Sequence, residues 1–432
     1  MAGRKRAPRR EAETTGLTTL HPPRPRTGRL TLPFLDGLRG LAALTVAIYH
    51  TYLFTGNTNQ TLTELPRALH PLRLGNLAVP AFIVLSGFVL MAPIVLTGRL
   101  SGGSALGFLK RRARRILPPY YIALLMFGAL IAAVPALTQS SGTAWDSKVP
   151  VSFWNAVSHI FLVHNVNSHW AVSIDGPLWS IAAEWQIYIL MPFVLLPTLR
   201  RFGNFAALSV AFGIGYAPRL LFGSAVDFAH PWFVGCFAIG MLAAQVALDE
   251  TRWTKLRKLC SPKVVAALVI ASGFAAAVEV DRVEAHLWVT EVAMSLLCAM
   301  GIIALTQSRS RVRRLLESRS LVALGGFSYS IYLIHSPILG FINLAALHLP
   351  LSLGVRFVLM LGLALPVALI ASRLFYLVVE RPIMQPRNSE PAAKTFSASA
   401  SARLADTVSR GVTTAGEREA KRASFASGPR VR

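Results

Sequence analysis

The side chains of this sequence that could do chemistry begin with an arginine and a histidine inside one apolar segment. FLDGLRGLAALTVAIYH, residues 34–50, contains Arg39 and His50, eleven positions apart. Eleven steps of about 100° leave them about 20° apart around a helix, with roughly 16 Å of rise between them. Ionisable side chains in a membrane helix are costly and usually face a cavity or a partner, so the segment predicts a functional face. The alternative is that Asp36 and Arg39 are interfacial anchors and that His50 reaches the outer boundary.

A dense basic cluster follows further along the chain. Positions 110–115, within FLKRRARRILPPYY, contain five Lys or Arg residues. Guanidinium groups bind phosphate oxygens in a bidentate geometry, so the cluster suits a phosphorylated cofactor. The alternative is a cytoplasmic anchor of the kind that the positive-inside rule describes. The candidate cofactor-binding residues here are Arg111, Arg112, Arg114 and Arg115.

An acidic residue occurs in a second apolar segment, GPLWSIAAEWQIY, which spans residues 176–188. Glu184 follows Ser180 by four positions, so the two share a helix face, and Trp179 fits an outer aromatic belt. A buried carboxylate there would have either a raised pKa or a cationic partner. By depth in the membrane we expect a pair between His50 and Glu184; a structural bridge from Glu184 to an arginine is the alternative.

A third segment with polar groups is GFSYSIYLIHSP, residues 326–337. Tyr329 and His335 could line a polar cleft, or they could connect helices by hydrogen bonds. No cysteine and no G-x-S-x-G elbow is suited to be a nucleophile, and no cysteine spacing predicts a metal site.

These residues require a membrane scaffold. The chain has 432 residues, of which 53% are hydrophobic and 15% charged, whereas soluble domains carry about 25% charged residues. With about 20 residues per span, the sequence predicts an all-α, polytopic membrane bundle of about ten helices, and a short interfacial or re-entrant helix at 151–165. The ten stretches are 35–56, 75–96, 117–137, 178–199, 204–222, 228–248, 263–280, 286–306, 321–341 and 354–379.

The distribution of positive charge predicts the topology. If the N-terminus is cytoplasmic, the cytoplasmic pieces contain 36 of the 44 Lys and Arg residues, which is the positive-inside bias. We therefore expect a multi-pass protein of the plasma membrane with both termini cytoplasmic. A net charge of +24 is also typical of nucleic-acid binders, but these charges follow membrane sidedness and predict no nucleic acid partner. The expected organisation is a disordered basic arm (1–33), a transmembrane domain (34–385) and a disordered cytoplasmic tail (386–432).

Six segments together resemble the bacterial acyltransferase family 3 membrane proteins, in the order in which that family has them, over about residues 34–382. They are FLDGLRGLAALTVAIYH, GNLAVPAFIVLSG, FLKRRARRILPPYY, GPLWSIAAEWQIY, FSYSIYLIHSP and FYLVVERP. Proteins of this family transfer acyl groups, often acetyl from a coenzyme A thioester, to hydroxyls of carbohydrates and related acceptors. Many relatives carry a further SGNH-type hydrolase domain. The polar 45-residue tail of this chain leads us to expect no transfer through such a second domain.

The resemblance implies roles for the ionisable residues. The family's Arg-x10-His pair matches Arg39 and His50, with His50 as the catalytic residue, and the acidic residue of its Leu-Trp-Ser…Glu motif matches Glu184. We expect His50 to be the general base for the acceptor hydroxyl, with Glu184 orienting its imidazole. Direct transfer is preferred; an acyl-histidine intermediate is the alternative.

The family's Arg-x-x-Arg motif matches either Arg111 and Arg114 or Arg112 and Arg115; the second pair is preferred because Arg115 directly precedes Ile-x-Pro. The hypothesis is that these arginines and Arg39 bind acyl-CoA, most simply acetyl-CoA, and that no metal takes part. The acceptor is a carbohydrate or a glycosylated small molecule, and an exporter of an acylated metabolite is the rival class. Further candidate substrate-binding residues are Asp36, Trp179, Ser180, Tyr329 and His335.

Overall fold

A computed structural model describes residues 32–249 and 251–385, and every regular element in these ranges is a helix. The predicted all-α class is therefore confirmed. The chain divides into two units, Met1–Glu380 and Arg381–Arg432, and the second unit is described only over α19 (Arg381–Met384) and the following residue. The predicted arm and tail lie outside the described residues, except that α1 already begins at Pro33.

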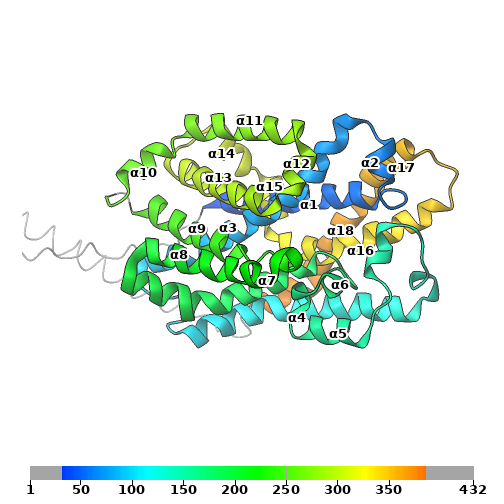
Figure 1. Ribbon diagram of the computed structural model, residues 1–432, viewed down its shortest axis with the longest axis horizontal. Coiled ribbons are helices and arrows are strands. Elements are labelled where there is room, and N and C mark those ends of the chain that lie inside the picture. The colour runs from blue at the N-terminus through cyan, green and yellow to red at the C-terminus, as the bar shows by residue number, and fades with distance from the viewer. Residues whose placement is uncertain (1–31, 250, 386–432) are drawn as a thin grey trace, which may run out of the picture. The chain divides into compact units, whose positions relative to one another are not determined.

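Twelve helices form most of the first unit (Figure 1). They are α1 (Pro33–Phe54), α3 (Ala78–Thr97), α4 (Ala105–Ala133), α7 (Leu178–Leu190), α8 (Leu196–Phe222), α9 (Phe233–Leu248), α11 (Pro262–Val278), α13 (Leu287–Gln307), α15 (Arg319–Gly326), α16 (Ser328–Leu347), α17 (Leu353–Leu359) and α18 (Leu365–Phe375). Short helices connect them: α2 (Gln60–Glu64), η1 (Arg67–Leu77), η2 (Pro135–Leu137), η3 (Ala144–Lys148), α5 (Phe153–Ile160), η4 (His164–Val166), α6 (Ser168–Ala171), η6 (Gly223–Ala229), α10 (Thr254–Leu259), α12 (Val280–Ala285) and α14 (Arg311–Leu316). Single π-helical turns, η5 (Met191–Leu195), η7 (Met360–Ala364) and η8 (Tyr376–Glu380), follow α7, α17 and α18.

Six helical segments of the described chain are long and apolar enough to cross a membrane. They are Arg67–Thr97, Ala105–Ala133, Leu178–Ala229, Leu287–Gln307, Ser328–Leu347 and Leu353–Met384. The chain is thus a multi-pass membrane protein, while the number ten and the cytoplasmic termini remain predictions. The helix α1 is not among the six, because its polar residues reduce its mean hydropathy. The segment predicted to be interfacial forms α5, whose eight residues are too few to span a bilayer.

The helix α1, which carries Arg39 and His50, packs closely against α15, and Figure 1 shows the two side by side. Glycines make this approach possible: a Cβ built on Gly40 would lie 2.3 Å from the carbonyl oxygen of Leu321, and one built on Gly325 would lie 1.9 Å from that of Asp36. Small residues at helix crossings of this kind let membrane helices associate through their backbones. The glycines of the DGLRG motif therefore fix the helix that carries Arg39 and His50.

A second close crossing joins α3 and α9, which share the largest interface of the bundle. A Cβ built on Gly87 would lie 2.2 Å from the carbonyl oxygen of Phe237, and one built on Gly240 would lie 2.2 Å from that of Val84. Backbone atoms cannot rotate away as side chains can, so this crossing requires glycine on both helices.

The segment between α4 and α7, which we call the roof loop (residues 134–177), folds back over the bundle. Trp145 anchors it: its side chain is fully buried, its Nε1 donates to the Leu137 carbonyl (2.8 Å), and its ring lies 4.9 Å from that of Phe341 on α16. Asp146 caps the loop by accepting hydrogen bonds from the backbone amides of Ser141 and Gly142. Hydrogen bonds within the roof loop and the packing of Trp145 against α16 therefore hold the loop in place.

Candidate active site

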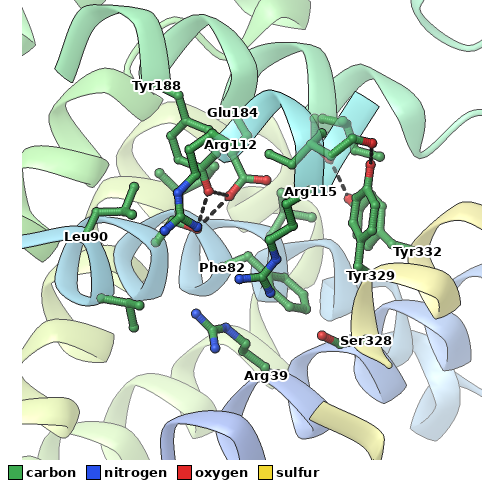
Figure 2. A pocket seen from close by; sticks show the side chains of 17 residues that line it. Arg39, Phe82, Leu90, Arg112, Arg115, Glu184, Tyr188, Ser328, Tyr329 and Tyr332 are labelled. Carbon is green, nitrogen blue, oxygen red and sulfur yellow. Dashed lines mark hydrogen bonds between the residues drawn. The ribbon is translucent and has the colours of Figure 1, made fainter. Parts of the chain in front are cut away.

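Three of the arginines predicted from the sequence line a cavity of about 110 Å³ between α1, α3, α4, α7 and α16. Arg39 enters it from α1, and Arg112 and Arg115 enter it from α4. Figure 2 shows the three guanidinium groups directed into the same space. We call it the arginine cavity; its other polar lining residues are Ser86, Ser180, Glu184, Tyr188, Ser328, Tyr329 and Tyr332.

Most of the positive charge in the arginine cavity is not neutralised by direct contact. Arg39 donates from Nη1 to Oδ1 of Asp36 (3.0 Å), and that carboxylate is half-exposed. Neither Arg112 nor Arg115 has a carboxylate oxygen within 4.0 Å in the described part of the chain, and Nε of Arg112 is buried without a hydrogen-bond partner. Buried donors without partners are rare because leaving one unsatisfied costs about 1–3 kcal/mol. The cavity therefore suits a multiply charged anion.

The structure separates the two Arg-x-x-Arg alternatives by position. Arg112, which is half-buried, and Arg115, which is exposed, line the cavity, whereas Arg111 and Arg114 lie outside its lining. Arg111 instead donates to Ser101 on the surface at 3.4 Å. Of the two predicted pairs, only Arg112 and Arg115 line the arginine cavity.

Glu184 does not pair with His50, so that part of the sequence prediction is wrong. Its Oε1 accepts a hydrogen bond from Ser86 (2.6 Å) and a short one from Tyr188, and it lines the arginine cavity. Among the groups that act on it electrostatically is Arg39. Depth along the membrane normal, the only information the sequence offered, does not fix the direction in which a side chain points around its helix.

His50 lines a second, larger cavity of about 580 Å³, which we call the histidine cavity. Its walls include the C-terminal half of α1, the start of α13 and two stretches of the roof loop, and its volume is in the range of small-molecule sites. Val79 and Tyr332 line both cavities, so the two approach each other at these residues. The face of α1 that carries Arg39 and His50 thus opens into both.

The partner of His50 is His335, on α16. Nδ1 of His50 lies 2.9 Å from the Val46 carbonyl and 3.1 Å from Nε2 of His335. Nδ1 of His335 lies 2.7 Å from the Ile331 carbonyl, so a proton there leaves its Nε2 as an acceptor. Both contacts of His50 then assign a proton to its Nδ1 and leave Nε2 with a free lone pair. His335, predicted as a substrate-binding residue, takes the orienting position expected of Glu184.

The remaining predicted residues have defined places. Trp179 lines the histidine cavity and stacks on His230 with a centroid distance of 4.3 Å. Ser180 donates to the hydroxyl of Tyr332 (2.8 Å), and Tyr329 donates to the Ile116 carbonyl (2.9 Å). These two bonds connect α7, α16 and α4 beside the arginine cavity. Asp36 lines neither cavity and contacts Arg39 instead.

Sequence reasoning missed several polar residues of the histidine cavity. His230 and Glu291 form a buried pair (Nδ1 to Oε2, 2.8 Å), and Lys148, only 3% exposed, comes from the roof loop. Burial lowers the pKa of Lys148, against the attraction of Asp175, and burial raises the pKa of Asp175. A signal existed: Lys148 is one of few basic residues in the predicted outward loops. No group of three or more His, Cys, Asp or Glu over residues 32–249 and 251–385 could hold a metal ion.

The fold and the site define a multi-pass helical membrane protein with charged side chains in internal cavities. The chain belongs to the acyltransferase 3 family, since residues 32–373 match its model, described as an acyltransferase domain. The resemblance seen in the sequence is thereby confirmed, and membership supports an enzyme that transfers acyl groups.

Three relatives illustrate this similarity. The O-acetyltransferase OatA of Staphylococcus aureus is 27% identical over 335 residues, which cover 72% of this chain and 51% of the relative. The acyltransferase MdmB of Streptomyces mycarofaciens is 27% identical over 395 residues, covering 84% and 93%. The peptidoglycan O-acetyltransferase OatA of Listeria monocytogenes is 30% identical over 198 residues, covering 44% and 28%. This chain spans about half the length of the staphylococcal relative. No solved structure matches this chain.

Proposed function

We propose that this protein transfers an acetyl group from acetyl-CoA, bound at the arginine cavity, to a hydroxyl of a carbohydrate or glycosylated small molecule in the histidine cavity. The observation that carries the proposal is the meeting of the two cavities at Val79 and Tyr332. The arginine cavity offers the guanidinium groups of Arg112 and Arg115, which have no carboxylate partner within the described chain. The histidine cavity offers the imidazole of His50, whose Nε2 is free.

The donor suits the arginine cavity by charge and by shape. Arg112 and Arg115 would hold its phosphates, because guanidinium groups bind phosphate oxygens in a bidentate geometry. The narrow, linear pantetheine arm of the donor would run from this cavity of about 110 Å³ toward the histidine cavity. The rise of roughly 16 Å from Arg39 to His50 along α1 is comparable to the length of that arm.

The chemistry follows from the protonation of His50. Its free Nε2 takes the proton of the acceptor hydroxyl while the hydroxyl oxygen attacks the thioester carbonyl carbon. The carbonyl electron pair moves to oxygen; when it returns, the C–S bond breaks and the imidazolium gives its proton to the leaving thiolate. His335 acts as a positioning residue, since it holds the Nδ1–H tautomer of His50. This order transfers the acyl group directly to the acceptor.

The name of one relative supports the acceptor class, and the predicted topology supports the side from which the acceptor enters. The Listeria relative is a peptidoglycan O-acetyltransferase by name, which favours a carbohydrate hydroxyl. The positive-inside bias predicts that the arginine cavity faces the cytoplasm, where acetyl-CoA is present, and that the roof loop faces outward. Acetyl groups would then cross the membrane within the protein, and the acceptor would enter from outside.

The test is acetyl-CoA consumption by the purified, full-length protein. We expect the wild-type chain to release coenzyme A from acetyl-CoA, measured with a thiol-reactive dye, and the His50→Ala variant to lose this activity while still binding radiolabelled acetyl-CoA. His348→Ala is the matched control, because His348 is exposed at the end of α16. Activity of His50→Ala close to wild type would refute the proposed role of His50. An exporter would move its cargo without consuming acetyl-CoA.

A further inference from the structure

The histidine cavity contains a buried cation that the mechanism above does not use. Lys148, at the end of η3 in the roof loop, is 3% exposed and lines the cavity together with His50. Its Nζ lies 5.0 Å from the centroid of the Phe54 ring, one helical turn beyond His50 on α1. The positive charge acts on both His50 and His335. The ammonium and the candidate base therefore share one site.

The ammonium of Lys148 has space around it and no hydrogen-bond acceptor within the described chain. A Cβ built on Gly176 would lie 2.9 Å from Nζ of Lys148, so the absence of a side chain there makes space for it. Asp175 attracts the ammonium, yet its carboxylate oxygens are not within 4.0 Å of Nζ. Within the described chain, Nζ donates no hydrogen bond. Three N–H donors thus remain for a group inside the cavity.

A desolvated ammonium beside a general base suits one chemical task in acyl transfer. When a hydroxyl attacks a thioester, the carbonyl oxygen gains a full negative charge in the tetrahedral species, and preorganised donors lower its energy. An ammonium in a site of low dielectric constant interacts more strongly with that charge than it would in water. Asp175, whose carboxylate oxygens lie more than 4.0 Å from Nζ, attracts the ammonium without occupying its donors.

We propose that Lys148 is a catalytic residue whose ammonium stabilises the oxyanion formed when the acceptor attacks the acetyl thioester. This inference rests on the proposed function. His50 accepts the hydroxyl proton, the new C–O bond forms, and the carbonyl π electrons become the oxyanion held by Lys148. As the C=O bond re-forms, the C–S bond breaks, and the proton on His50 passes to the sulfur. Lys148 keeps its own proton throughout.

The rival explanation is that Lys148 and Asp175 are only a structural charge pair. Breaking a buried pair from one side leaves an uncompensated charge and is strongly destabilising, whereas replacing both partners is often neutral. The double variant Lys148→Met/Asp175→Asn therefore separates the explanations, since it removes the unpaired carboxylate as well as the ammonium. Gly176→Ala is a second test, because it retains both charges and displaces only the ammonium.

The experiment measures coenzyme A release from acetyl-CoA by the full-length protein in nanodiscs, with water or N-acetylchitopentaose as acceptor. We expect Lys148→Met to lower kcat by about 10²–10³-fold with an unchanged KM for acetyl-CoA. The double variant should recover the wild-type melting temperature but not kcat, and Gly176→Ala should lower kcat in a folded protein. Lys263→Met, at an exposed lysine, is the matched control and should behave as wild type.

Three results would overturn the proposal: recovery of kcat in the double variant, a Lys148→Met rate within threefold of wild type, or wild-type kcat in Gly176→Ala. A rise in the acceptor KM alone would assign Lys148 to acceptor binding and would also refute the oxyanion role. Failure of the proposed function looks different, because wild-type protein would then release no coenzyme A, or His50→Ala would release it at the wild-type rate.

Discussion

The arginine cavity makes a quantitative prediction about donor binding. Arg112→Gln removes one guanidinium whose Nε is buried without a partner, while glutamine retains much of the side-chain length. A hydrogen bond to a charged group contributes about 1.5–3 kcal/mol. Since 1.4 kcal/mol corresponds to a factor of ten, we expect the Kd for acetyl-CoA to increase by roughly 10- to 150-fold.

The helix α4 supplies its own control. Arg111 precedes Arg112 directly but is exposed and lies outside the cavity lining, so Arg111→Gln changes the same formal charge on the same turn. Surface charges are screened by salt and contribute little to binding at about 0.15 M ionic strength. We therefore expect its Kd to remain within about threefold of wild type.

Binding of radiolabelled acetyl-CoA to purified protein, by scintillation proximity, measures both constants without any acceptor. Equal losses in Arg111→Gln and Arg112→Gln would show that the cluster acts only as a basic surface, as the positive-inside interpretation holds. An unchanged Kd in Arg112→Gln would remove the arginine cavity as the donor site. Repeating the binding measurement at several salt concentrations separates the contribution of the exposed Arg111 from that of Arg112 in the cavity, since only the exposed charge is strongly screened.

Three further predictions concern other parts of the site and the scaffold. Glu184→Gln removes the only carboxylate lining the arginine cavity and should lower the Kd for acetyl-CoA severalfold; a lower kcat at unchanged Kd would instead support the original pairing with His50. Gly87→Ala places a Cβ 2.2 Å from the Phe237 carbonyl and should destabilise the protein by about 1–3 kcal/mol, seen as a lower Tm in detergent, whereas Gly128→Ala meets nothing within 4 Å and should not. The rate should fall as pH rises through the pKa of Lys148, which burial lowers from 10.5, because the protonated form is lost there; Lys148→Met should lack this alkaline decline. The other titratable groups that line this part of the cavity or act on it are Tyr49, His50, Asp146, Asp175, His230, Glu291, Tyr332 and His335.

Much of the fold could be predicted because bilayer physics leaves few choices. An apolar run of about 20 residues in lipid must satisfy its backbone internally and therefore forms a helix. Eleven-residue spacing predicts Arg39 and His50 on one face of a helix, and α1 is a single helix from Pro33 to Phe54 that contains both residues. The face opens into two cavities, with Arg39 in one and His50 in the other.

The errors have a common cause in tertiary packing. The sequence gives the depth of Glu184 but not its direction, and the partner of His50 comes from α16, which is 285 residues away along the chain. His335 could be recognised as a polar residue in an apolar segment, yet nothing local distinguishes a substrate ligand from a partner of His50. The cavities themselves form from five or more helices and a loop, so no single segment encodes them.

The distribution of basic residues predicts more than the membrane topology, because it also singles out individual residues. Basic residues are scarce in the predicted outward loops, so each one there calls for its own explanation. Arg73 forms ion pairs with Asp281 and Glu284, and Arg282 lies 3.5 Å from Glu279, so acidic neighbours account for both. Arg67 is exposed to solvent. Lys148 is buried without an ion pair within 4.0 Å in the described chain, and it alone of these four shares a cavity with His50. A cation in a predicted outward loop that is buried, and whose Nζ donates no hydrogen bond within the described chain, is more simply explained by catalysis than by folding.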